Sequence, residues 1–350
     1  IKLGVMQKII FTFFSILAIP VLIFAGNPDR QGEAGAYELL MNPWARSGAL
    51  NSLNASCISG VEAMMVNVAG ISRINKWEIG LSQTKWLRPS GININAGGFA
   101  VKIGKSGTLG VSLMNLDFGE IRVTTNATPE GTGATYSPSF SNIGVGYAHT
   151  FGNKIAVGVL FKGISESIQD LNTFGFSIDA GVQYVSGAQD NFKFGIALRN
   201  VGGPMSFSGD GLSTQLKSPE NTDITYNVRL SQFELPSQLH IGISYDFIPS
   251  ESIKLTPMLN FTSNSFGRDE IGAGAEIKIT QYFALRGSYK YELGSNEDKI
   301  NKTAHTGLAA GASVSVPLKK KSETRLAIDY GYKHSDPFQG THQFGVRLEF

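Results

Sequence analysis

Residues 341–350 read Thr-His-Gln-Phe-Gly-Val-Arg-Leu-Glu-Phe, and this closing stretch alternates strictly between polar or small and apolar side chains. Its apolar face comprises Phe344, Val346, Leu348 and Phe350. A period of two is that of a β-strand with one apolar face. The pattern recurs along the chain without helical segments that could cover the apolar faces, so we expect a closed barrel with lipid outside and polar side chains in its lumen. The terminal aromatic Phe350 also resembles the insertion signal of outer-membrane barrels in Gram-negative bacteria.

Fourteen segments from residue 76 onward have strand character. They are 76–86, 92–104, 107–118, 140–151, 154–167, 172–186, 190–201, 237–248, 252–264, 269–280, 282–293, 305–318, 323–334 and 341–350. An even number of strands is required if both ends of the chain lie in the periplasm. We therefore predict an all-β fold, a 14-stranded antiparallel transmembrane β-barrel over residues 76–350, which spans the bacterial outer membrane many times with both termini periplasmic.

The connections between these segments alternate in length. The short ones are 105–106, 152–153, 187–189, 249–251, 281 and 319–322, and the long ones, 119–139, 202–236 and 294–304, all belong to the opposite set. This asymmetry is typical of outer-membrane barrels, whose long loops are extracellular. The loop 202–236 could either cap the barrel mouth or contact a partner. Its candidate contact residues are Met205, Phe207, Tyr226 and Phe233.

The N-terminal part of the chain differs from the barrel. Residues 1–25 contain Lys2 and Lys8 before a long uncharged apolar run, which predicts a secretory signal peptide, with a membrane-anchoring helix as the alternative. Residues 26–75 have helical propensity over 33–41 and 58–66, interrupted by Asn42-Pro43 and by 67–70. We predict that 26–75 form a hatch of short helices inside the lumen.

Composition excludes several function classes. Without Lys2 and Lys8 the count of Lys and Arg falls from 30 to 28, equal to the 28 Asp and Glu, so the mature chain is formally neutral and nothing favours nucleic acid binding. Cys57 is the single cysteine, and the five histidines lack metal-ligand spacing. A Gly-x-Ser-x-Gly elbow is absent. We therefore expect no catalytic residues, no metal and no cofactor.

The predicted hatch contains two distinctive motifs. The first is Leu-Leu-Met-Asn-Pro-Trp-Ala-Arg-Ser at 39–47, and the second is Asn-Val-Ala-Gly-Ile at 67–71. Together they resemble the start of PorV/PorQ family proteins. The matching residues are Pro43, Ala45, Arg46, Asn67, Ala69 and Gly70. Val68 stands where the family has a proline. The resemblance covers about the first 50 residues after the signal, whereas the barrel resembles only the architecture of the fatty-acid transporter FadL.

This resemblance implies an outer-membrane component of the type IX secretion system of Bacteroidota. Such a barrel would bind or shuttle cargo, or dock to the translocon or the attachment complex, and its partners would be other secretion components, cargo C-terminal signal domains and outer-membrane lipid. The alternative is a FadL-like channel for hydrophobic small molecules, and a purely structural subunit is a third possibility. The predicted inward charges Arg286, Lys290, Asp329 and Arg347 favour a polar lumen over an apolar one.

Overall fold

The computed structural model describes residues 26–295, 303–318 and 323–350. The predicted signal peptide, 1–25, and the connection 319–322 lie outside the described residues. Among the described residues, none of the helices combines the length and apolar character needed to cross a membrane.

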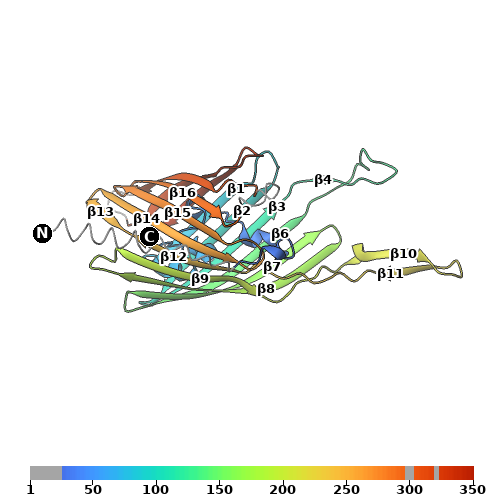
Figure 1. Cartoon of the computed structure of the whole chain (residues 1–350), viewed down its shortest axis with the longest axis horizontal. Coiled ribbons are helices and arrows are strands. Elements are labelled where there is room, and N and C mark those ends of the chain that lie inside the picture. Colours follow the sequence, from blue (N-terminus) through green and yellow to red (C-terminus); the bar gives the residue numbers. More distant parts are fainter. Residues whose placement is uncertain (1–25, 296–302, 319–322) are drawn as a thin grey trace.

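Fourteen antiparallel segments close into a barrel, which confirms the predicted fold class (Figure 1). The strands are β1 (Trp77–Lys85), β2 (Asn93–Ile103), β3 (Gly107–Asp117), β6 (Ser139–Phe151), β7 (Ile155–Ile168), β8 (Leu171–Ser186), β9 (Phe192–Gly202), β12 (Gln238–Tyr245), β13 (Phe247–Ser250), β14 (Ile253–Asn264), β15 (Glu270–Ile279), β16 (Phe283–Glu292), β17 (Leu308–Pro317), β18 (Arg325–Lys333) and β19 (Thr341–Glu349). Strands β12 and β13 form a single crossing, because both pair with β14.

The closing strand β19 pairs with β1 and so closes the barrel. Val346 lies opposite Leu81 in an antiparallel register. Beyond the strand, the backbone N–H of Phe350 donates to the carbonyl of Trp77 at 3.0 Å, and the two rings stack with centroids 6.2 Å apart. The ammonium of Lys76 lies 3.8 Å from the Phe350 ring centroid. The terminal aromatic residue is therefore packed against the first strand of the barrel.

The two faces of the barrel wall differ sharply. On β8 the side chains of Phe174 and Phe176 are 60% and 67% exposed, whereas the alternating Ser177, Asp179 and Gln183 are buried. The same division holds around the barrel, and the outward apolar side chains have no covering element among the described residues. An uncovered apolar belt on a closed sheet is the lipid-facing surface of a transmembrane barrel.

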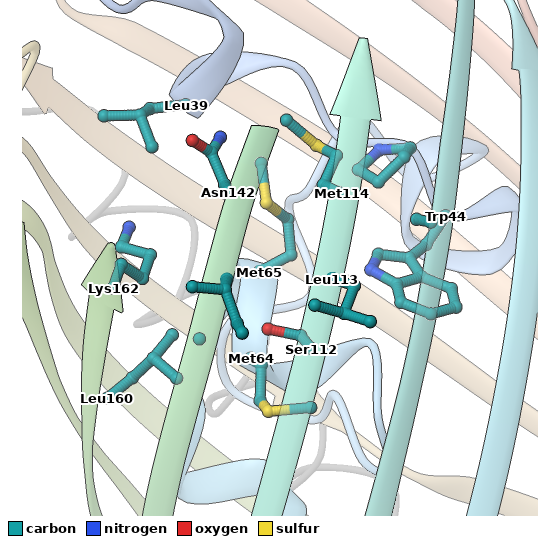
Figure 2. Close-up of a pocket in the computed structure, with 14 residues that line it drawn as sticks. Leu39, Trp44, Met64, Met65, Ser112, Leu113, Met114, Asn142, Leu160 and Lys162 are labelled. Carbon is teal, nitrogen blue, oxygen red and sulfur yellow. The ribbon is translucent and has the colours of Figure 1, made fainter. Parts of the chain in front are cut away.

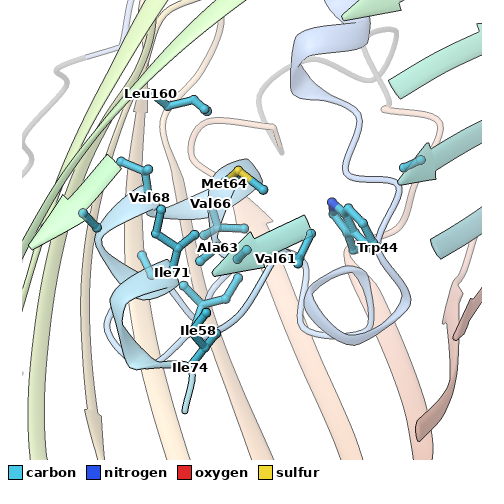
Figure 3. Packing of buried hydrophobic residues seen from close by; sticks show 14 residues of the cluster. Trp44, Ile58, Val61, Ala63, Met64, Val66, Val68, Ile71, Ile74 and Leu160 are labelled. Atoms are coloured by element: carbon cyan, nitrogen blue, oxygen red, sulfur yellow. The ribbon is translucent and has the colours of Figure 1, made fainter. Parts of the chain in front are cut away.

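The predicted hatch lies inside the barrel as a set of very short helices (Figure 1). They are η1 (Pro28–Arg30), η2 (Tyr37–Leu40), α2 (Ala45–Gly48), α3 (Ala63–Val66) and η3 (Val68–Arg73). Figure 3 shows Ile58, Val66 and Ile71 converging between α3 and η3 in a small apolar core. The predicted interruption begins where expected, because α3 ends at Val66 and Asn67 is extended. Residues 68–70, however, belong to η3, which Asn67 caps by accepting a hydrogen bond from the N–H of Ala69.

Two of the long connections contain strands that the sequence did not indicate. Strands β4 (Ile121–Arg122) and β5 (Thr135–Tyr136) pair in one, and β10 (Ser213–Lys217) and β11 (Asp223–Asn227) pair in the other, after η4 (Asp210–Leu212). Both ribbons project beyond the barrel at the end opposite the C-terminus (Figure 1). We call this the long-loop end, although it also contains the two-residue turn Gln169-Asp170 between β7 and β8.

Candidate functional site

The hatch is fastened to the barrel wall through Asn67, which is 1% exposed. Its amide nitrogen donates to the carbonyl oxygens of Ala55 at 2.9 Å and Val182 at 3.1 Å, so it joins the hatch to β8. The hatch backbone also approaches β7 closely at Gly158, where a Cβ would lie only 2.8 Å from the backbone nitrogen of Ala69. The second predicted motif therefore lies where the hatch meets the wall.

The first predicted motif contacts a different part of the wall, at β1. The carbonyl of Pro43 accepts hydrogen bonds from the hydroxyls of Ser82 at 2.7 Å and Thr84 at 2.8 Å on β1. Arg46 forms a buried ion pair with Glu62 within the hatch, with Nε and Oε1 3.1 Å apart. Burial and hydrogen bonding make these contacts costly to break.

Small residues of both motifs allow the backbones to approach closely. The carbonyl oxygen of Ala45 would lie 2.5 Å from a Cβ at Gly331, and that of Ile58 would lie 2.3 Å from a Cβ at Gly70. The motif residues thus position the hatch, and a role for them in partner recognition stays a prediction.

Charged side chains fill one side of the lumen in a connected network. The guanidinium of Arg286 contacts Glu276 at 2.6 Å and donates to the hydroxyl of Ser313 at 2.5 Å. Ser313 in turn donates to Asp329, which lies 3.6 Å from Arg347. Together with Lys290, which contacts Glu270 at 2.8 Å, these residues confirm the predicted inward charges. Paired charges make this side of the lumen polar.

Further ion pairs line the lumen at β7, β8, β9 and β14. The carboxylate of Asp246 lies 2.6 Å from the ammonium groups of both Lys193 and Lys254. The ammonium group of Lys162 lies 2.8 Å from the carboxylate of Asp179. The hatch lies inside the barrel together with these ion pairs and fills much of the lumen (Figure 1).

A small cavity lies between the hatch and the wall at β2, β3, β6 and β7 (Figure 2). Its volume is about 40 Å³, and Met64, Met65, Met114 and Trp44 give it a largely apolar lining. A cavity that holds benzene measures about 150 Å³. An aromatic ring would therefore enter only if the flexible methionines or the hatch moved.

A larger hollow lies on the outer face of the barrel, across β1, β2, β3, β6, β7 and β8. This groove measures about 500 Å³. Its outward lining combines apolar side chains with a row of amides and hydroxyls: Leu81, Leu113, Ile143, Phe174, Asn95, Asn115, Ser141 and Ser165. Alternation predicted these faces but not the groove, whose floor includes Gly97 and Gly163 from separate strands.

The candidate contact residues of the loop 202–236 divide into two groups. Met205 is 2% exposed and pairs with Phe233 through two backbone hydrogen bonds of 2.8 Å. Met205 packs with Leu39 of the hatch, and the ring of Phe207 lies 5.9 Å from that of Phe233. This part of the loop forms a cap, so Met205 is not available at the surface. Tyr226, by contrast, is 48% exposed on β11.

The β10–β11 ribbon has one apolar face. Leu216 lies directly opposite Ile224, and Tyr226 follows two residues later on the same face. These three side chains are 55%, 38% and 48% exposed. A two-stranded ribbon with an uncovered apolar face is marginally stable by itself, so the ribbon has the character of an interaction surface.

Comparison with known proteins identifies the fold. No protein-family model matches the chain, and no curated protein matches it. Among solved structures it is similar to the CymD monoaromatic hydrocarbon channel, at 13% identity, covering 89% of this chain and 98% of that one, with a TM-score of 0.53. It is also similar to the Ralstonia pickettii toluene transporter TbuX, at 13% identity, covering 88% and 97%, with a TM-score of 0.53. A Pseudomonas aeruginosa FadL homologue matches at 12% identity, covering 87% and 96%, with a TM-score of 0.50.

These similarities establish a FadL-like barrel architecture for the chain. The outward apolar belt agrees with an outer-membrane β-barrel. Two of these neighbours are named as a monoaromatic hydrocarbon channel and a toluene transporter.

Proposed function

We propose that this barrel binds protein partners at its long-loop end, as a type IX secretion component that captures cargo signal domains or docks to the translocon or the attachment complex. The proposal rests on one observation above all: the lumen is plugged, while the β10–β11 ribbon presents an uncovered apolar face beyond the barrel. Such a ribbon suits a protein surface, since both backbone edges and apolar side chains are available.

The plugged lumen supports a binding role over conduction. Asn67 and Pro43 tie the hatch to two separate parts of the wall, at β8 and β1, and ion pairs occupy the space around it. In this proposal the long-loop end faces the cell exterior and the C-terminus faces the periplasm. The hatch motifs that resemble the PorV/PorQ family would then keep the platform rigid rather than touch the partner.

The experiment is capture of partners from native outer membrane followed by mass spectrometry. A triple variant, Leu216→Ser, Ile224→Ser and Tyr226→Ser, removes the apolar face of the ribbon, and we expect it to lose secretion components or cargo signal domains that the wild type retains. The matched control changes the polar face, Gln215→Ala with Thr225→Ala, and should retain them. Recovery of no secretion component or cargo by the wild type would exclude the proposal.

A second candidate is a FadL-like channel for hydrophobic small molecules, and the structural neighbours favour it more than they favour a secretion role. The methionine-lined cavity supplies the observation on this chain, because it lies between the hatch and the wall, where a ligand would have to pass. Its volume of about 40 Å³ requires the hatch to shift before an aromatic compound could enter.

The channel candidate predicts that Met64→Trp blocks uptake. Met64 is 4% exposed and lines the cavity, so an indole there fills the space that a ligand needs. We expect entry of a hydrophobic fluorescent probe into cells carrying the barrel to fall to the level of cells without it. Leu285→Trp, on the lipid-facing surface, is the control and should leave entry unchanged. Equal entry with wild type and Met64→Trp would argue against this path.

A further inference from the structure

The start of the hatch, Gly26, is held at the long-loop end of the barrel. Its backbone nitrogen donates a hydrogen bond of 2.6 Å to the carboxylate Oδ2 of Asp269. Asp269 lies in the connection 265–269 between β14 and β15 and is 4% exposed. Because the strands alternate in direction, this connection lies at the same end of the barrel as the loop 202–236. The hatch therefore begins at the long-loop end.

The contact with Asp269 leaves no room for a side chain at position 26. A Cβ there would lie 2.7 Å from Oδ1 of Asp269 and 2.8 Å from the carbonyl oxygen of Gly267. The carbonyl oxygen belongs to the backbone and cannot rotate away as the end of a side chain can. Close approach of one backbone to another group is a use for which glycine is suited. The geometry at this carboxylate therefore requires glycine at position 26.

The carboxylate of Asp269 is also fixed from its other side. Its Oδ1 accepts a hydrogen bond from the N–H of Asn264 at 3.2 Å, and the amide of Asn264 donates to the carbonyl of Arg268 at 2.6 Å. The N–H of Leu293 donates to the carbonyl of Asp269 at 2.8 Å, which joins the connection to the end of β16. A carboxylate held in this way is a preorganised acceptor for a donor at Gly26.

The residues that follow Gly26 are bound as well. The guanidinium of Arg30 lies 4.2 Å from the ring centroid of Phe266, and its Nη2 lies 3.0 Å from the carboxylate of Glu234. The N–H of Gly35 donates to the carbonyl of Glu234 at 3.1 Å. The first residues of the hatch are thus held between two connections of the barrel.

This placement bears on the two alternatives for residues 1–25, a cleaved signal peptide or a membrane-anchoring helix. An anchor that ends at Ala25 would bring an apolar segment directly to the buried carboxylate of Asp269, which is an unfavourable neighbour for it. A cut after Ala25 would instead leave an ammonium group beside that carboxylate. Alanine is also one of the small residues that precede such a cut.

We propose that the chain is cleaved between Ala25 and Gly26, and that the ammonium group of the new N-terminus binds the carboxylate of Asp269. A signal peptidase would hydrolyse this peptide bond with one water molecule. The proton that the new carboxyl group of Ala25 loses is taken up by the amine of Gly26. The hydrogen bond to Asp269 then has a charged donor as well as a charged acceptor, which strengthens it. Cleavage thus completes the attachment of the hatch at the long-loop end.

The proposal places the mature N-terminus at the long-loop end, whereas the even number of strands predicts a periplasmic one. The number of strands determines only where β1 begins. That point is beside the C-terminus, since the N–H of Lys76 donates to the carbonyl of Phe350 at 2.9 Å. Between residue 26 and β1 the hatch runs through the lumen, so the two ends of the hatch lie at opposite ends of the barrel (Figure 1).

The test determines the N-terminus of the barrel purified from cells that express the full chain. The folded barrel is treated briefly with an amine-acylating reagent, and then unfolded and digested with trypsin. Trypsin cuts after Arg30, so a start at Gly26 yields the peptide Gly-Asn-Pro-Asp-Arg, which mass spectrometry identifies. We expect this peptide from the wild type. Its α-amine should be labelled about tenfold more slowly than in Asp269→Asn, because an adjacent carboxylate favours the unreactive ammonium form.

The matched control is Asp29→Asn, which makes the same change at an exposed carboxylate within the same peptide. Labelling of the α-amine should stay slow in this variant. Gly26→Ala provides a second variant if Asp269→Asn does not fold. Its Cβ separates the amine from Asp269, and its small side chain still suits the peptidase, so its N-terminal peptide should be labelled rapidly.

Two results would overturn the proposal. A purified chain that starts at any residue other than Gly26, or that retains residues 1–25, would show that the cut lies elsewhere or does not occur. A start at Gly26 with equal labelling rates in the wild type and in both variants would show that the ammonium group does not bind Asp269. Both readouts concern the barrel alone, so they do not depend on whether it binds secretion components.

Discussion

Replacement of Arg286 by Leu is expected to lower the free energy of unfolding by about 3 kcal/mol. The Arg286 side chain is 3% exposed, and it contacts both Glu276 and Ser313. Its loss leaves Glu276 with a single, longer contact to Lys278 at 3.3 Å. A buried charge that loses its partner is strongly destabilising, because water cannot replace the lost contact. Urea unfolding in detergent, followed by tryptophan fluorescence, measures the effect.

The matched control for Arg286→Leu is Lys290→Leu. Lys290 also contacts a carboxylate, that of Glu270, but its side chain is 32% exposed and solvent screens the pair. We expect a loss of less than about 1 kcal/mol there. The double variant Arg286→Leu with Glu276→Gln should recover part of the stability, since it removes the unpaired charge. Equal effects of the two single variants would show that the network is not buried in solution.

Replacement of Gly158 by Val is expected to release the hatch from the wall. A Cβ at this position would lie 2.8 Å from the backbone of Ala69, and backbone atoms cannot move aside as a flexible side chain can. Overpacking of this kind costs about 1–3 kcal/mol or more, and here it also separates Asn67 from Val182. Limited trypsin digestion with mass spectrometry should show new cleavage at Arg46 and Arg73 in the variant, while the wild-type hatch stays protected.

Gly287→Val controls for the substitution itself. Gly287 lies on β16, and a Cβ there meets open space, so valine should leave the hatch protected. Protection of the hatch in both variants would mean that it does not dock on β7 as the structure shows.

The barrel itself could be predicted from the sequence because its signal is local and repeated. A period of two marks each strand, and lipid requires the outward face to be apolar on every strand. The predicted strand boundaries agree with the structure to within three residues at each end. The loop asymmetry agrees for the described connections, since the long connections 119–139 and 202–236 lie at one end of the barrel. The predicted connection 319–322 and residues 296–302 of the predicted loop 294–304 lie outside the described residues.

The ribbons were missed for a physical reason. Strands β4 and β5 are two residues long, and β10 carries Ser, Thr and Gln beside a single Leu216, so neither stretch has a clear alternation. Their pairing depends on the loops being held at both ends by the barrel. The sequence correctly predicted that the hatch contains short helices. They are only three to six residues long, because the chain must turn repeatedly inside the lumen.

The sequence alone determined that this chain forms a fourteen-stranded barrel with a lipid-facing belt and a charged interior, since those properties follow from the alternation of single residues along each strand. Only the tertiary structure decided what lies inside and beyond the barrel. Gly158 meets Ala69, Asn67 donates to Val182, and Leu216 faces outward uncovered, and each of these placements joins or separates segments that are distant in the sequence. Contacts of that kind depend on how the hatch and loops pack, and no periodic pattern along the chain encodes them.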